Sequence, residues 1–500
     1  MTETWQVYPS IIPLYVVGIS LLAVPLIVLS NNRPNLREFW TLGASIVKFL
    51  LVFSLLPNLL SHRIALFTLW EIAPGITLTL KADAMGVFFA LVASSLWIAT
   101  SLYSIGYMRG LKEHKQTRYF ASFAVCLSAT MGIAFAANIL TFLIFYEILT
   151  VATYPLVIHK ETKEAISAGR KYLAYTLSAG ILLIAATVLT YKLTGNLDFK
   201  AGGIFDPTSL PRQRAWILFL LFLGGVGVKA AIMPLHSWLP AAMIAPTPVS
   251  ALLHAVAVVK SGAFGVLRLV GFIFGPTLMH LYGLDILLTT LACLTIITAS
   301  LLAFRQDNLK HRLAYSTVGH LSYIVLGAAL LSPAAFAGAL LHLLNHAFLK
   351  ITLFFCAGAI YVTMHKEKIS ELKGVGHAMP WTMGAFTIAT IGLMGVPPLN
   401  GFISKWEICL GSLQAGTVLP LIILIISGLL NGGYLFPIIY KAYYTGTHHP
   451  IKEKEPYIMV VPLLVTISFA VLLGLFPNGV FTFFDLATGV GKEILRGFVR

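Results

Sequence analysis

Ionisable side chains occur inside long apolar stretches of this sequence, where a charge is costly to bury. Of the 19 acidic residues, only Glu147 falls near the middle of such a stretch, ILTFLIFYEILTVATYPL. Five basic residues do the same, namely Lys48, Lys229, Lys260, Lys350 and Lys405. Charged groups at membrane depth face the protein interior, pair with one another and mark ion or proton pathways. The sequence therefore predicts an ion path, either for protons or for protons exchanged against sodium.

Glu147 and Lys229 are the two residues that we expect to act as a switch. Burial disfavours the charged form of a lysine, whereas a nearby carboxylate stabilises it. A pair whose separation changes would therefore control whether Lys229 holds a proton. The alternatives are a protonated Glu147 that bonds a backbone carbonyl and a Lys229 that extends to the membrane interface.

Two further apolar segments carry histidine and lysine together. His254 and Lys260 are six positions apart, about 120° around a continuous helix, so we expect them to serve successive steps. His342, His346 and Lys350 are spaced i, i+4, i+8, which places them on one stripe along about 12 Å of helix. Neutral imidazole accepts a proton at one nitrogen and donates at the other, as a relay requires. The alternative is a zinc site, but no third ligand lies nearby in sequence, so we expect no metal.

Lys405 follows a Pro-Pro pair in a second-half segment and is expected to be the far end of the path. His236 and His320 are equally compatible with a relay role and with a structural role. Lys48 has no titratable neighbour in its segment, so packing or extension to the interface explains it as well.

The elements that must position these residues are transmembrane helices. The chain has 500 residues, of which 58% are hydrophobic and 11% charged, whereas soluble domains carry about a quarter charged residues. A span needs about 20 apolar residues, and on that criterion about fourteen segments qualify. They centre near residues 20, 50, 95, 127, 148, 181, 226, 258, 291, 321, 348, 394, 429 and 468. We therefore predict an all-α polytopic protein with one membrane domain over 1–500.

Two of these spans contain prolines that should break the helix. One reads GVGVKAAIMPLHSWLP (Gly224–Pro240) and the other MGVPPLNGFISKW (Met394–Trp406). Such breaks persist in a membrane only where the freed backbone groups are buried in protein or line a wet cavity. The breaks are five spans apart, and two successive five-helix units must point in opposite directions. This pattern predicts two inverted repeats, over about 117–272 and 280–441.

The charge distribution predicts the orientation in the membrane. The net charge is +15, and we attribute it to loop topology and not to nucleic-acid binding. Of the 34 basic residues, 19 fall in loops on one side and 10, Arg268 among them, on the other. Because cytoplasmic loops collect Lys and Arg, both termini are expected outside the cytoplasm.

The sequence contains no recognisable cofactor motif. The four cysteines lie in apolar stretches without metal-ligand spacing, so we interpret them as core residues. No iron–sulfur, haem, phosphate-loop or dinucleotide motif occurs. We expect no cofactor in this chain, and any redox centre would belong to another subunit. Enzyme class stays open, since partner subunits of an oxidoreductase, a hydrogenase or a translocase would each suit.

Three motifs together resemble a known membrane superfamily. They are KAAIMPLHSWLPAAMIAPTPVSALLHAVAVVKSG, HLLNHAFLK and GVPPLNGFISKW. The resemblance is to the antiporter-like subunits of respiratory complex I, of membrane-bound hydrogenases and of Mrp-type sodium/proton antiporters, and it covers essentially the whole chain. It implies a fourteen-helix fold with two inverted five-helix units and a chain of buried charges.

The resemblance also implies roles for individual residues. Glu147 matches the fifth-helix glutamate and Lys229 its seventh-helix partner, His254 and Lys260 match eighth-helix relay positions, and Lys405 matches the terminal twelfth-helix residue. Lysine at this last position and the short stretch after the last span fit the Mrp D-type subunit, or its counterpart in a membrane-bound hydrogenase, best. One departure is Ala241, where relatives commonly carry Asp, which puts a loop salt bridge there in doubt.

We therefore expect a proton-translocating or Na⁺/H⁺-antiporting subunit of a multisubunit complex in the cell membrane. A complex I pump subunit is the alternative within the superfamily. A stand-alone transporter of an organic solute is the alternative from another class, although the ionisable residues form a series and not a substrate-shaped site. A membrane scaffold that only anchors partners is a third possibility, but the many buried titratable groups count against it.

Overall fold

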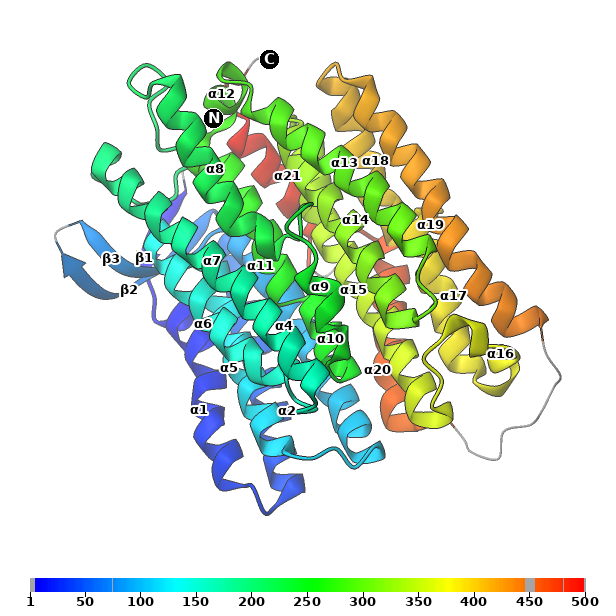
Figure 1. The fold of residues 1–500 in the computed structure, drawn as a ribbon. Helices are drawn as coiled ribbons and strands as arrows, with labels where there is room; N and C mark the ends of the chain where they lie inside the picture. The colour runs from blue at the N-terminus through cyan, green and yellow to red at the C-terminus, as the bar shows by residue number, and fades with distance from the viewer. Residues whose placement is uncertain (1–4, 74, 446–454, 480, 499–500) are drawn as a thin grey trace.

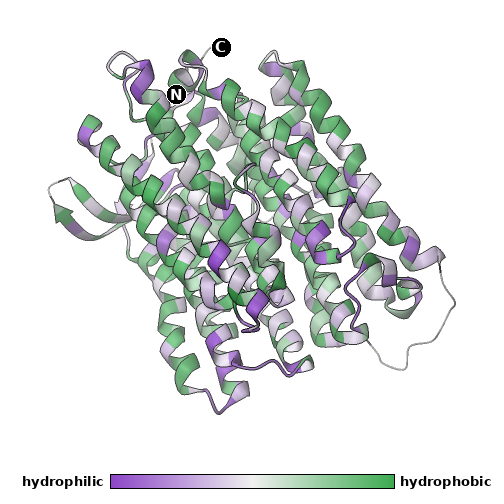
Figure 2. Ribbon diagram, in the orientation of Figure 1, coloured by the Kyte–Doolittle hydropathy of each residue, from purple (hydrophilic) through white to green (hydrophobic). Residues whose placement is uncertain are grey.

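The computed structural model describes residues 5–73, 75–445, 455–479 and 481–498. Most of them form one bundle of roughly aligned helices (Figure 1). Apolar residues dominate the length of these helices, and polar residues gather at many of the helix ends and connections (Figure 2). This is the distribution that a bilayer imposes, because polar side chains are costly in its hydrocarbon core and are favoured where the helices meet water.

Ten segments in the described residues are long and apolar enough to cross a membrane. They are α1 (Ile12–Leu29), α2 (Pro34–Phe53), α4 (Ala84–Gly110), α6 (Ile139–Val157), α7 (Lys163–Thr194), the series α10 (Thr247–Ala255), α11 (Val258–Arg268) and η2 (Leu269–Phe274), α13 (Leu284–Phe304), α15 (Pro333–Met364), α19 (Val418–Tyr444) and α20 (Tyr457–Leu475). Each lies at a position that the sequence predicts.

The remaining four predicted positions hold shorter or more polar helices. These are α5 (Gln116–Ala134), α8 (Arg212–Lys229), α14 (Leu309–Ala329) and the pair α17 (Pro380–Met394) and α18 (Asn400–Gln414). The predominantly helical membrane fold is confirmed, whereas the count of fourteen spans and the inverted repeats stay predictions. Short helices complete the chain: α3 (Leu56–Leu60), α9 (Trp238–Ala241), η1 (Ala242–Ile244), α12 (Pro276–Leu281), η3 (Ile369–Glu371), α16 (Val375–Ala378) and α21 (Phe483–Ile494).

A small sheet departs from the all-α prediction. Strand β2 (Arg63–Ala73) pairs in parallel with β1 (Gln6–Pro9) and antiparallel with β3 (Ile76–Ala82). The hairpin of β2 and β3 projects from one side of the bundle (Figure 1). Gly75, between the two strands, has φ +76°, a backbone conformation that glycine adopts readily.

Two of the three most buried segments carry the ionisable residues. The segment Thr247–Phe274 is wholly buried, and α15, like α4, has 78% of its apolar window buried, against 33% for α1. Helix α15 packs against α10, α14, α17, α18, α20 and α21. Because surrounding helices separate these two segments from lipid, they can hold polar side chains that an outer helix could not.

The helices are interrupted at both predicted places. Helix α8 ends at Lys229, and α17 ends at Met394, ahead of α18 at Asn400. A third interruption, between Ala255 of α10 and Val258 of α11, was not predicted, since no proline or glycine marks it. The assumption that His254 and Lys260 share one continuous helix is therefore wrong.

Arg268 is a second correction. The sequence places it among loop cations, but it is buried in α11, 1% exposed, and pairs with Asp83 at the start of α4. The two guanidinium nitrogens donate to the two carboxylate oxygens at 2.7 and 2.9 Å. The bidentate pair makes the charge tolerable in an apolar segment.

Candidate functional site

Lys229 is fully buried at the last residue of α8, where the predicted break begins. Its Nζ donates to the backbone oxygen of Tyr146 at 2.6 Å and lies 3.3 Å from the centre of the Tyr146 ring. Helix α11 reaches this position because Gly262 has no side chain: a Cβ there would lie 2.1 Å from the backbone nitrogen of Ala230. The glycine thus brings the helix of Lys260 against the end of α8.

Glu147 is the residue after Tyr146 on α6, but its carboxylate does not contact Lys229. Successive helical residues point about 100° apart, so Tyr146 faces Lys229 while Glu147 faces α7. Its carboxylate lies against Gly180, where a Cβ would be 2.6 Å from Oε1. Oε1 has no hydrogen-bond partner among the described residues. The predicted switch pair is therefore adjacent but not in direct contact.

A hydrogen bond joins the two central segments. The Nζ of Lys260 lies 2.8 Å from Nδ1 of His346 on α15, and both residues are fully buried. If the ammonium donates, Nδ1 of His346 must be the unprotonated nitrogen, and its proton then sits on Nε2. Nε2 has no partner in the described part of the chain.

Three histidine rings form a cluster next to this bond. The ring centre of His320 on α14 lies 5.3 Å from those of both His342 and His346. Its Nδ1 is 3.1 Å from Nε2 of His342, and Nδ1 of His342 is 3.0 Å from the hydroxyl oxygen of Ser404 on α18. Lys260, the three rings and Ser404 form a nearly continuous series across four helices.

Lys405 follows Ser404 and caps the second helix break. Its Nζ donates to the backbone oxygens of Leu393 and Met394 at 2.7 and 2.9 Å. These are carbonyls at the end of α17, which the break leaves without a helical partner. The lysine thus stabilises the proline break, because its ammonium group bonds the carbonyl oxygens that the break leaves without partners.

Lys350 forms a side branch of the series. Its Nζ donates to the hydroxyl of Ser316 on α14 at 2.7 Å and to the backbone oxygen of Leu313 at 3.3 Å. The hydroxyl of Tyr434 on α19 donates to the same Ser316 at 2.7 Å. The predicted stripe on α15 therefore divides, with its histidines in one cluster and its lysine in another.

His254, Lys48 and His236 lie outside the bonded series. Both ring nitrogens of His254 lack partners among the described residues, and the ring stacks on Phe354 at 4.8 Å. Lys48 lies 4.9 Å from the ring centre of Trp97, and its Nζ likewise has no described partner. His236 stands in the turn after α8, 6.1 Å from the ring of Tyr315.

Sequence reasoning undervalued helix α14. Ser316, His320 and Tyr323 are spaced i, i+4, i+7 and all face the buried groups, so the same stripe pattern that singled out α15 was present. Ser404 was missed because a lone serine beside a lysine carries no distinctive pattern.

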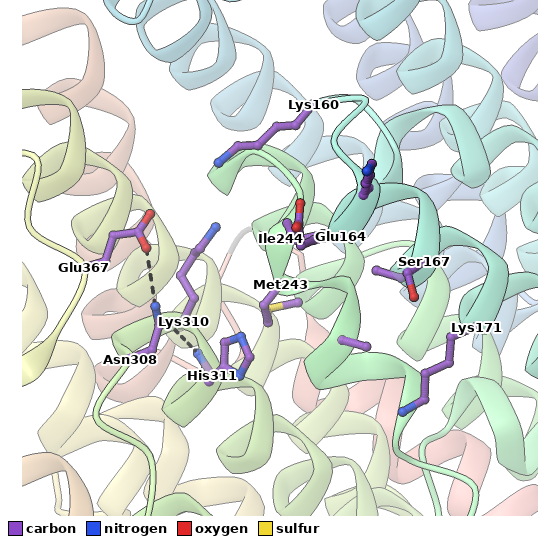
Figure 3. Close-up of a pocket in the computed structure, with 13 residues that line it drawn as sticks. Lys160, Glu164, Ser167, Lys171, Met243, Ile244, Asn308, Lys310, His311 and Glu367 are labelled. Atoms are coloured by element: carbon purple, nitrogen blue, oxygen red, sulfur yellow. Dashed lines mark hydrogen bonds between the residues drawn. The ribbon is translucent and has the colours of Figure 1, made fainter.

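A basic hollow of about 750 Å³ opens between α7, η1 and the start of α14 (Figure 3). Lys160, Lys163, Lys171, Lys310 and His311 line it, with two glutamates. The Nζ of Lys310 donates to the backbone oxygen of Ala245 at 3.0 Å, just before the helix that carries His254. This hollow lies on the side whose loops are richest in Lys and Arg.

Among the described residues, His342 and His346 do not belong to a group of three side chains whose ligand atoms come close enough to hold a zinc ion. Within the described residues, one group of three His, Cys, Asp or Glu side chains brings its ligand atoms together, and it lies elsewhere, at Glu113, His114 and His159. The described cysteines are unpaired, three of them buried and Cys409 partly exposed.

Comparison with known proteins identifies the family. A family profile described as "NADH:quinone oxidoreductase/Mrp antiporter, TM" matches residues 136–431, more than half of the chain. The chain belongs to this family. NADH-quinone oxidoreductase subunit N of Desulforudis audaxviator is 31% identical over 428 residues, covering 81% of this chain and 83% of the relative.

Other similar proteins come from different kinds of membrane complex. Hydrogenase-4 component B of Escherichia coli is 31% identical over 424 residues, covering 80% of this chain but only 62% of its own length. A Na⁺/H⁺ antiporter subunit A1 of Staphylococcus aureus is 29% identical, covering 77% and 49%. The subunits of complex I, hydrogenases and Mrp antiporters that the motifs predict are thus all among the relatives.

The fold agrees with two solved complexes. A chain of the Mrp complex from Dietzia sp. superposes with a TM-score of 0.86 at 19% identity, covering 97% of both chains. A chain of an archaeal membrane-bound sulfane sulfur reductase gives 0.84 at 24% identity, covering 97% and 98%. The protein is a multi-pass membrane subunit of the NADH:quinone oxidoreductase/Mrp antiporter family.

Proposed function

We propose that this subunit carries protons along the buried series from Lys229 through Lys260, His346, His320, His342 and Ser404 to Lys405. The observation that carries the proposal is the nearly continuous contact from Lys260 to Ser404, with separations of 2.8, 3.1 and 3.0 Å at its bonded steps. Each group in this series can both accept and release a proton. Packing alone does not require so many titratable groups in one place.

One step of the series needs a bridge. Nε2 of His346 and Nε2 of His320 are both buried without a described partner, and their rings are 5.3 Å apart. A single water molecule between them would satisfy both nitrogens and complete the chain of hydrogen bonds. This is the point at which the path is most easily opened or closed.

Glu147 and Lys229 control entry to the series. The ammonium of Lys229 is held by a backbone oxygen at 2.6 Å, one residue away from the carboxylate. A small change at the end of α8 would exchange this neutral acceptor for the charged one, which stabilises the protonated lysine. Lys229 would then hold a proton while paired and release it when separated.

We place the chain in a complex with other membrane subunits. Its relatives carry the names of complex I, hydrogenase and antiporter subunits, and one structural neighbour is part of an archaeal respiratory membrane complex. We propose that it is inactive alone and that ion exchange or a partner's chemistry drives it. Robust, saturable Na⁺/H⁺ exchange by the purified chain alone would contradict this.

The orientation is part of the proposal. Both termini are expected outside the cytoplasm, since 19 basic residues are assigned to one set of loops. A reporter that works only in the cytoplasm, fused after the last residue, should be inactive. Activity there would invert the assignment.

The experiment that tests the path compares two buried lysines. Lys260→Met should reduce proton translocation by the reconstituted complex at least about tenfold, since the series loses its first bonded donor. Lys48→Met is the matched control, because Lys48 is equally buried but outside the series. Equal translocation by the two assembled variants would refute the path.

A further inference from the structure

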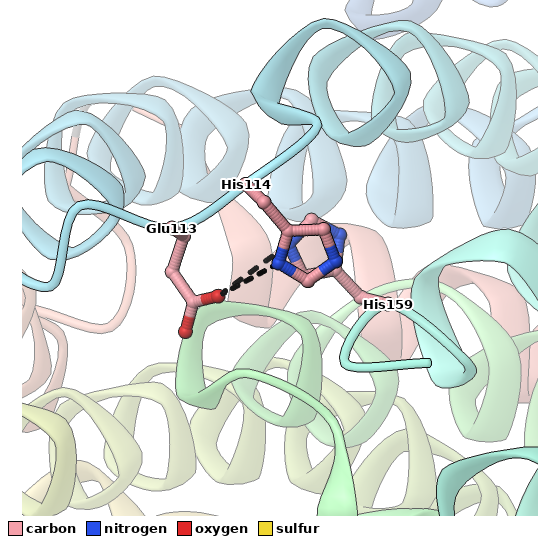
Figure 4. Close-up of side chains that lie close together, drawn as sticks. All are labelled: Glu113, His114 and His159. Atoms are coloured by element: carbon pink, nitrogen blue, oxygen red, sulfur yellow. Dashed lines mark ion pairs between the residues drawn. The ribbon is translucent and has the colours of Figure 1, made fainter. Parts of the chain in front are cut away.

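A second group of titratable side chains lies apart from the proton series, at a loop end of the bundle. Glu113 and His114 belong to the connection between α4 and α5, and His159 follows the end of α6. One ligand atom from each lies within 4.8 Å of the other two. Figure 4 shows the two imidazole rings facing each other, with the carboxylate of Glu113 directed at their nitrogens.

His159 is the unusual member of this group. Its side chain is 0% exposed, yet neither ring nitrogen has a hydrogen-bond partner among the described residues. Nε2 points at Oε2 of Glu113 from 3.7 Å, which is too long for a hydrogen bond. A buried imidazole without a partner is costly, so an additional group at this point would stabilise it.

His114 approaches the same carboxylate oxygen. Its Nδ1 lies 3.9 Å from Oε2 of Glu113, and its ring stacks on that of His159 with centres 5.0 Å apart. Two nitrogens from different loops thus lie 3.7 and 3.9 Å from one carboxylate oxygen, and the ligand atoms of the group are all within 4.8 Å of one another.

We propose that Glu113, His114 and His159 bind a divalent transition-metal ion of the zinc type. Zinc bonds to imidazole nitrogen and carboxylate oxygen are about 2.0–2.2 Å long, so ligand atoms around a tetrahedral ion lie about 3.3–3.6 Å apart. The observed separations of 3.7 and 3.9 Å need to shorten by only a few tenths of an ångström. Two imidazoles and one carboxylate suit zinc, whereas calcium and magnesium prefer oxygen ligands.

Two cationic side chains near the site are neutralised by a separate carboxylate. Lys115 and Arg118 would repel a cation, but both are engaged by Glu161, at 2.7 and 2.5 Å. Glu161 is therefore committed to its own cations, and water completes the coordination of the metal.

The ion would link two loops that are separate in the chain. One follows α4, and the other ends α6, the helix that carries Glu147. Metal occupancy would restrict their relative movement, in a region that does not touch the proton series.

The test is zinc binding to the purified complex, prepared with a histidine-free tag and stripped by chelator. One Zn²⁺ per chain should bind, and Co²⁺ in its place should show the absorption of a tetrahedral site. His114→Ala and Glu113→Gln should each weaken binding at least about tenfold, since loss of outer-shell partners alone costs about 10–100-fold. His114 is 45% exposed, so its replacement should not disturb folding.

The matched control is His365→Gln, an exposed loop histidine after α15 that is not part of the cluster. It should bind zinc as the unaltered complex does. If the unaltered complex retains no zinc, or if His114→Ala and Glu113→Gln bind it with unchanged affinity, the proposed site is wrong.

Discussion

The substitution Gly180→Ala tests whether the position of the Glu147 carboxylate matters, because it should move the carboxylate without replacing the residue. Gly180 lies on α7, and a Cβ built there would be 2.6 Å from Oε1 of Glu147, 2.8 Å from Cδ and 3.0 Å from Oε2. Ordinary contacts to a Cβ begin at 3.4 Å. In Gly180→Ala the carboxylate must therefore move by roughly 0.8 Å, away from α7 and within a space that its side chain can reach by rotation.

The cost in stability should be small. The displaced atoms are the end of a flexible side chain, and alanine favours a helix interior over glycine by about 0.5–1 kcal/mol. We expect the melting temperature to change by no more than a few degrees. Proton translocation should fall about tenfold or more, since misplacing reacting groups by about 1 Å costs up to about 10²-fold.

The assay is proton or antiport flux in proteoliposomes that contain the intact complex, with subunit content checked in parallel. Gly384→Ala on α17 is the matched control, because a Cβ there meets nothing within 4 Å. Glu147→Gln provides the reference for complete loss of the charge. If Gly180→Ala shows wild-type flux while Glu147→Gln shows none, the position of the carboxylate does not matter and the argument is refuted. If Glu147→Gln itself shows wild-type flux, Glu147 has no part in the mechanism.

Three further outcomes are expected from other contacts. Ser404→Ala should slow translocation in the assembled complex while Ser404→Thr retains most of it, because His342 needs a hydroxyl at 3.0 Å; equal flux in both variants would exclude the hydroxyl. Arg268→Ala should destabilise the protein by about 3–5 kcal/mol by leaving Asp83 unpaired, measured as thermal unfolding in detergent, and Asp83→Asn in the same chain should restore part of the loss. Hydrogen bonds from Ser370 lower the pKa of the Asp307 carboxyl below 3.8, so this contact is fully present above pH 3.8 and is lost as the pH falls through the lowered value. Backbone hydrogen exchange at residues 368–371 should accordingly become faster only below pH 3.8. In Ser370→Ala the exchange of these amides should already be faster at neutral pH.

The sequence predicted those features that depend on local pattern. Apolar length located the spans, and the prolines located two of the helix breaks, because each acts within a few residues of its position. The motifs around Lys229, His346 and Lys405 led to the correct family. Buried lysines and histidines were recognisable individually, since an ionisable residue in an apolar run is conspicuous.

Features that depend on contacts between helices were not predictable from pattern. The break before Lys260 has no proline, and it arises where α10 and α11 pack inside the bundle. Arg268 appeared to be a loop residue because its partner, Asp83, is 185 positions away. The direction of Glu147, towards α7 and away from Lys229, follows from the rotation of α6, which sequence spacing fixes only relative to its own neighbours.

In the hydrogen bond between the buried rings of His320 and His342, one ring donates and the other accepts, so on the proposed path successive protons would not find the same starting arrangement. When a ring takes a proton on one nitrogen and gives up the proton on the other, it is left as the opposite tautomer. His320 and His342, stacked at 13° with centres 5.3 Å apart, cannot accept a second proton from the same side until both have turned or exchanged protons backwards. Both rings are almost fully enclosed, so a reset by turning of the rings requires neighbouring helices to move. The first proton after a resting period should cross quickly, and later ones should follow at the slower pace of the reset.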